Sequence, residues 1–92
     1  MAQGTLHIIS ANTTRQMLEW CLKQASGEDA ILFAGVVPDS GYARQAASVM
    51  MGVYQLSESG DDRTTELVPG VVRIDYRGWV QLCCDFEKTI SW

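Results

Sequence analysis

The three cysteines are the side chains of this sequence best suited to nucleophilic chemistry. The helical spacing around Cys21 places it on the same face as Leu18 and Leu22, as expected of a small buried side chain that contains sulfur. A reactive thiol needs partial exposure and basic neighbours, and few basic residues lie near Cys21 in the sequence. Cys83 is expected at a core position of a later helix and Cys84 to one side of it, so we expect both to be inert.

The one histidine and the acidic residues are weaker candidates for a reaction centre. His7 lies in an apolar strand and shares no motif with Cys21, so a structural imidazole explains it better than a catalytic base. The acidic residues between positions 58 and 66 lack the spacing of a calcium-binding loop. We therefore assign no metal and no cofactor.

One glycine-containing loop, residues 35–41, has a composition compatible with anion binding. Its backbone N–H groups could point at a phosphate from the start of a helix. The loop lacks the lysine of a Walker motif and the spacing of a G-x-G-x-x-G motif. A turn that uses Gly35 and Pro38 for their backbone conformations explains the same residues.

Two periodicities alternate along the chain and predict the elements that carry these residues. Short apolar segments predict strands over residues 5–9, 30–34, 53–56 and 71–74, with a short terminal strand over 90–92. Apolar residues at helical spacing predict helices from Arg15 to an end at Gly27, over 42–50 and over 79–86, with a polar loop over 57–66. Strands that alternate with helices predict an α/β fold: a small three-layer, open, mostly parallel sheet of four to five strands with helices on both faces.

Length and composition set limits on the number of domains and on the function class. The 92 residues are expected to form one domain, 1–92, and a hydrophobic fraction of 47% is typical of globular proteins. A net charge of −4 argues against direct nucleic-acid binding. The apolar runs are too short to span a membrane, and the first residues do not form a secretory leader. An odd number of cysteines argues against a disulfide framework, so we expect a cytoplasmic protein with reduced thiols.

Segments spread over nearly the whole length share a pattern with one known family. Leu6-His7 resembles that family's L-H-T start, residues 18–23 resemble a first-helix segment in which some members carry a cysteine, and residues 30–36 resemble a second strand with a D-G-V-Y ending. Residues 53–56 resemble its V-Y-x-L strand, residues 74–82 resemble I-D-Y-x-x-F-V-x-L, and Trp92 fits its closing residue. Together these segments resemble the DsrH/TusB family, small subunits of sulfur-relay complexes.

The resemblance implies a DsrEFH-like fold and a role in sulfur transfer. It implies an assembly with homologous DsrE/TusD-like and DsrF/TusC-like subunits, in which another subunit carries the principal persulfide cysteine. The sulfur would pass through protein partners toward 2-thiolation of the tRNA wobble uridine. The chain departs from the family pattern at Ala34, at Val37-Pro38 and in the D-L-x-A-R-G segment that is missing after the third strand, so the resemblance says least about the loop contacts.

Three functional hypotheses follow. In the first, the chain is an accessory subunit of a cytoplasmic sulfurtransferase complex, not a catalyst alone, and its tryptophans and Met50-Met51 contact neighbouring subunits. Homo-oligomers stay open in this hypothesis. In the second, Cys21 is an accessory sulfur acceptor, a DsrH-type persulfide carrier in sulfur oxidation, because some family members keep a cysteine at the matching place. In the third, unrelated to sulfur, residues 35–41 make the chain a small anion-binding α/β module.

Overall fold

The computed structural model of the chain describes residues 4–35, 40–56 and 70–92, and within these ranges five strands form one sheet. The strands are β1 (Thr5–Ile9), β2 (Ala30–Phe33), β3 (Gly52–Leu56), β4 (Val72–Ile74) and β5 (Lys88–Ser91), and the helices are α1 (Arg15–Gln24), α2 (Ser40–Val49) and α3 (Tyr76–Asp85). The strand order is β4-β3-β2-β1-β5, and every pair is parallel. The predicted polar loop, residues 57–66, lies outside the described residues.

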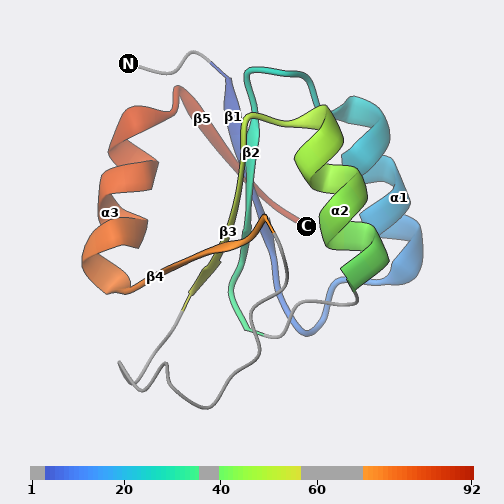
Figure 1. Cartoon of the computed structure of the whole chain (residues 1–92), viewed down its shortest axis with the longest axis horizontal. Helices are drawn as coiled ribbons and strands as arrows, with labels where there is room; N and C mark the ends of the chain where they lie inside the picture. The colour runs from blue at the N-terminus through green and yellow to red at the C-terminus, as the bar shows by residue number, and fades with distance from the viewer. Residues whose placement is uncertain (1–3, 36–39, 57–69) are drawn as a thin grey trace.

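The sheet is covered on both faces (Figure 1). Helices α1 and α2 lie side by side on one face, and α3 lies alone on the other. This arrangement confirms the predicted α/β fold with three layers, and the described sheet is parallel throughout. Every parallel connection must cross over the sheet, and the helices that make these crossovers cover its apolar faces.

Strand β2 is the centre of the hydrophobic core because all four of its residues are buried. Successive side chains of a strand point to opposite faces. Ile31 and Phe33 therefore pack against α1 and α2, whereas Ala30 and Leu32 pack on the side of α3. Full burial of a large apolar side chain contributes about 1.5 to 3 kcal/mol to folding. The prediction that this continuous apolar run forms a strand covered on both faces is therefore confirmed.

The inner face of α3 differs from the prediction. Leu82 and Phe86 are buried, but Cys83 is exposed, so its assignment to the core was wrong. The reason lies at Gly78, where a Cβ atom would be 2.9 Å from the Cβ of Ile74. Because glycine has no side chain, α3 approaches the sheet along the row formed by residues 78, 82 and 86. Each residue turns the helix by about 100°, and Cys83 is therefore turned away from the sheet.

Several element boundaries also differ from the sequence-based expectation, among them the start of α3 at Tyr76 instead of 79 and the following two. Helix α1 ends at Gln24, and Ala25 is already extended, with its N–H bonded to the Cys21 carbonyl oxygen at 3.0 Å. Gly27 therefore does not end the helix. The last strand begins at Lys88, earlier than expected, because its pairing with β1 starts opposite Thr5. Both shifts are within the usual uncertainty of element ends.

The entry to β1 predicts a strong steric effect at Gly4. A Cβ at this position would overlap the carbonyl oxygen of Glu28 and lie 2.6 Å from Oδ1 of Asp29. We expect Gly4→Ala to lower the free energy of unfolding by about 3 kcal/mol, because backbone atoms would have to move. Gly27→Ala is the matched control, since a Cβ there meets nothing within 4 Å. Urea unfolding of both variants tests this, and equal stabilities would contradict it.

Candidate functional site

Cys21 lies on the inner side of α1 and is fully buried. It belongs to the cluster that contains Ile31, Phe33 and Tyr42. Burial raises the pKa of the Cys21 thiol to about 11; a hydrogen bond with Tyr42 opposes this rise, and the negative charge of Asp29 adds to it. At pH 7 only about one such thiol in 10,000 is ionised. The thiolate that nucleophilic sulfur chemistry requires is therefore almost absent.

Tyr42 of α2 connects this thiol to the neighbouring helix. Its hydroxyl donates to the carbonyl oxygen of Leu18 at 2.8 Å and shares a hydrogen bond with Cys21. Burial raises the pKa of Tyr42 well above its usual range, and the adjacent Cys21 adds to the rise. The ring packs edge-on against Phe33, with centroids 6.1 Å apart. Both groups are neutral at physiological pH, so the pair joins α1 to α2 and is not a nucleophile with its base.

His7 has a hydrogen-bond partner on each ring nitrogen. Its Nε2 lies 2.8 Å from Oδ2 of Asp29, and its Nδ1 lies 3.0 Å from the indole nitrogen of Trp92. The indole N–H can only donate, so Nδ1 accepts, and Nε2 carries the proton that it donates to the carboxylate. The ring is 2% exposed and stacks on Trp92. A neutral imidazole with both nitrogens engaged has no free position for a substrate proton, in agreement with the structural role expected of His7.

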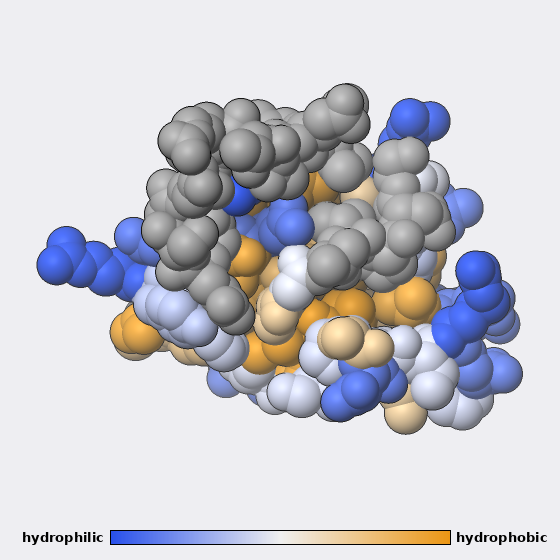
Figure 2. Space-filling view, turned by 90° about the horizontal axis from the view of Figure 1, so that it is seen from below, coloured by the Kyte–Doolittle hydropathy of each residue, from blue (hydrophilic) through white to orange (hydrophobic). Residues whose placement is uncertain are grey.

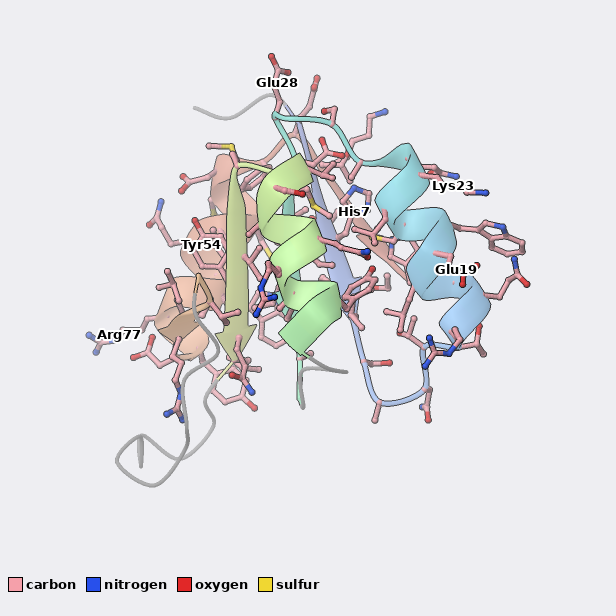
Figure 3. All side chains as sticks on the ribbon, turned by 45° about the vertical axis from the view of Figure 1, so that its right-hand side comes forward. His7, Glu19, Lys23, Glu28, Tyr54 and Arg77 are labelled. Carbon is pink, nitrogen blue, oxygen red and sulfur yellow. The ribbon has the colours of Figure 1, made fainter. Side chains whose placement is uncertain are left out.

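Asp29 is the central acceptor of this network, and the sequence analysis missed it. Besides His7, its carboxylate accepts from the backbone N–H of Thr5 at 2.9 Å, from the Ser26 N–H at 3.3 Å and from the Ser26 hydroxyl at 3.2 Å. Burial alone would raise the pKa of Asp29, but the hydrogen bonds from His7, Thr5 and Ser26 outweigh it and hold the pKa below its usual value. In Figure 3, His7 lies inside the fold while Glu28, next to Asp29, points outward.

A groove of about 380 Å³ lies between α1 and α2. Its walls combine leucine side chains of α1 with the polar groups of Arg15, Glu19 and Gln45 and with the phenol of Tyr42. Cys21 is not among its lining residues, so the groove gives no access to the buried thiol. The groove is open and carries charges of both signs, so its lining does not favour one chemical class of ligand.

At the carboxyl ends of the strands, where open α/β sheets usually bind ligands, two polar side chains cap helices. The Thr14 hydroxyl accepts from the Met17 N–H at 3.2 Å, and the Asp75 carboxylate accepts from the Gly78 N–H at 3.0 Å. Figure 2 looks onto this end of the molecule and shows hydrophobic residues in the middle, with hydrophilic ones toward both sides. Residues 36–39 of the glycine loop lie outside the described ranges, so the anion hypothesis stays a prediction.

The remaining thiols, Cys83 and Cys84, are both exposed on α3. Within the described residues, no three histidine, cysteine, aspartate or glutamate side chains lie together as metal ligands. No helix in the same part of the chain is both long and apolar enough to cross a membrane.

The burial difference among the cysteines predicts two classes of thiol reactivity. Because Cys83 and Cys84 are exposed, the sequence-based expectation that both are inert is replaced by the opposite one. In the native chain, we expect them to react rapidly with a disulfide reagent such as DTNB, and Cys21 only after unfolding, because its thiol is neither exposed nor ionised. Absorbance of the released thiolate counts the reacting groups. Cys21→Ala should leave the native count at two. A native count of three would show that the thiol is accessible after all.

The hydrogen bonds of Asp29 predict a specific acid sensitivity. Asp29→Asn should lower the free energy of unfolding at pH 7 by about 3 kcal/mol, because it disrupts a buried network. The pKa of Asp29 is lower in the folded chain than in the unfolded one. Its stabilising contribution is therefore complete above pH values of about 4 to 5 and disappears as the pH falls through the folded pKa.

Chemical unfolding between pH 3 and pH 7 measures this effect. The stability difference between wild type and Asp29→Asn should shrink toward the acid end. Glu28→Gln is the matched control, since Glu28 is the exposed carboxylate next in sequence, and it should change stability little at any pH. A difference that is constant across the pH range would contradict the prediction.

No protein-family model and no curated protein matches this chain. A function for this chain is therefore inferred from its geometry and its residue pattern.

Proposed function

We propose that the chain is a DsrH/TusB-type accessory subunit of a sulfur-relay complex and that it completes an interface instead of carrying the sulfur. The observation behind this proposal is the state of Cys21: fully buried, with a thiol pKa of about 11. A sulfur carrier at the matching place of the family pattern would need the opposite properties. The all-parallel sheet with helices on both faces is compatible with the fold that the resemblance implies.

Sulfur transfer between proteins proceeds by attack of a thiolate on a persulfide or disulfide sulfur. The acceptor thiolate must therefore be accessible to the donor sulfur. Cys21 is enclosed by β2 and α2, and ionising it costs the free energy that its raised pKa measures. These properties count against the alternative in which Cys21 is a persulfide carrier. They also fit a complex in which another subunit carries the principal persulfide.

The surface of the chain offers apolar side chains for contact with other subunits. Large apolar side chains are exposed on several elements of the fold: Trp20, Val49, Met51, Val72, Tyr76 and Val80. Met50 is buried in the core and Trp92 is bonded to His7, so Trp20 and Met51 are the expected contact residues that the structure exposes. Exposed apolar groups of this size are typical of surfaces that associate with other proteins when they gather in patches. We propose homologous DsrE/TusD-like and DsrF/TusC-like subunits as the partners, with tRNA wobble-uridine 2-thiolation as the pathway.

Charge and redox state agree with this assignment. A net charge of −4 is unfavourable for holding tRNA, so in this proposal the tRNA is bound elsewhere in the relay. All three cysteines are free. Free thiols are the usual state in the reducing cytoplasm, where we place the complex.

Co-expression with a DsrE/TusD-like and a DsrF/TusC-like subunit from the same organism tests the proposal. We expect native mass spectrometry to show one complex that contains all three chains. Cys21→Ala should assemble equally well and should leave tRNA 2-thiouridine, measured by nucleoside mass spectrometry, at the wild-type level. A chain that stays alone beside these subunits would contradict the proposal. Normal assembly with loss of 2-thiouridine in Cys21→Ala would instead show that Cys21 takes part in the sulfur transfer, contrary to the proposal.

A further inference from the structure

Trp92 follows β5 and is held to the rest of the fold by three hydrogen bonds. Its indole N–H donates to Nδ1 of His7 at 3.0 Å, and its backbone N–H donates to the carbonyl oxygen of Ile8 at 3.0 Å. Its carbonyl oxygen accepts from the Thr13 hydroxyl at 3.0 Å. The half-buried side chain also packs against the core cluster on the side of α1 and α2. These contacts join the residue after β5 to β1 and to the loop before α1.

The bond between Trp92 and His7 is the one that a proton can break. Nδ1 of His7 accepts from the indole only while this nitrogen carries no proton, and Nε2 holds the proton of the neutral ring in its bond to Asp29. A second proton on the ring therefore binds at Nδ1. It places two N–H donors 3.0 Å apart with no acceptor between them, so the imidazole and the indole can no longer keep this contact.

The other partner of His7 can hold the ring in both of its protonation states. Asp29 accepts from Nε2 in either state, and its lowered pKa keeps the carboxylate ionised over the pH range in which histidines titrate. Inside the fold, where Figure 3 places His7, the thiol of Cys21 and the phenol of Tyr42 are buried and neutral. The charged side chains of α1, α2, β5 and the turn before β2, other than Asp29, are exposed: Arg15, Glu19, Lys23, Glu28, Arg44 and Lys88. Protonation of His7 thus changes its contact with Trp92 and leaves its contact with Asp29 in place.

We propose that Trp92 is a proton-sensitive latch: its indole is docked on His7 while the imidazole is neutral, and it leaves that position when His7 binds a second proton. The residue then keeps two hydrogen bonds of its backbone, one of them from the side chain of Thr13. Thr13 lies between β1 and α1, at the end of the sheet where open α/β folds usually bind ligands. Acidification therefore loosens the end of β5 together with this loop. The latch does not depend on a role in sulfur transfer.

Hydrogen exchange of the indole N–H groups of the full chain, followed by NMR at about pH 7.5 and about pH 5, tests the latch. Each exchange rate is divided by that of Trp20, whose side chain is 48% exposed and reports the intrinsic pH dependence. The ratio for Trp92 should rise about tenfold at the lower pH, as expected for the loss of one hydrogen bond. Trp79 is the internal control, because its indole nitrogen is buried on the side of α3, and its ratio should stay constant.

The reciprocal effect on His7 tests the coupling. His7 is the one histidine of the sequence, so the NMR signals of its ring protons report its protonation directly. If docking of Trp92 opposes the second proton, removal of the indole must let that proton bind more readily. Trp92→Phe should therefore move the titration of His7 to higher pH. Trp20→Phe is the matched control, because it changes an exposed tryptophan, and it should leave the titration where it is in the wild type.

Three results would each overturn the proposal. The first is a Trp92 N–H that is as well protected at about pH 5 as at about pH 7.5. The second is an equal loss of protection at Trp79, which would show general unfolding. The third is a His7 titration that is identical in the wild type and in Trp92→Phe. If circular dichroism shows that Trp92→Phe does not fold, Thr13→Val takes its place, because it removes only the hydroxyl bonded to the Trp92 carbonyl and should shift the titration in the same direction.

Discussion

The buried hydrogen bond between His7 and Asp29 is the interaction on which the arrangement of β1, β2 and β5 depends. The carboxylate also binds Thr5 and Ser26, and the imidazole also binds Trp92. One polar cluster thus fixes the start of β1, the turn before β2 and the residue after β5. Buried polar groups are costly unless every donor and acceptor is paired, so each of these three segments can occupy only the position that satisfies the others.

Hydrogen bonds within the fold also limit which polar side chains are available for chemistry. His7 has no free nitrogen, the Tyr42 phenol is engaged with Leu18 and Cys21, and the carboxylate of Asp75 caps α3. Groups that could act as acids, bases or nucleophiles in another setting stabilise the fold in this one. Among the described residues, accessible thiols occur only on α3.

Local patterns predicted most of the fold, and long-range pairing explains what they missed. The apolar run of β2 and the helical register of Cys21 are properties of a few neighbouring residues, and both predictions were confirmed. Asp29 and His7 are 22 residues apart, and Trp92 and His7 are 85 apart, so their contacts follow from strand register and not from any local signal. Cys83 was misplaced because a stripe of apolar residues does not reveal which of its edges approaches the sheet.

The adjacency of Cys83 and Cys84 on one helix limits how this surface can respond to oxidants. Two neighbouring cysteines in a helix cannot form a disulfide with each other without unwinding the backbone around them. Any sulfur that they bond to must therefore come from outside the chain, whether from glutathione or from another protein. Disulfide formation at Cys83 or Cys84 therefore either adds the mass of a small thiol or links the chain covalently to another protein. The buried core is not involved in either reaction.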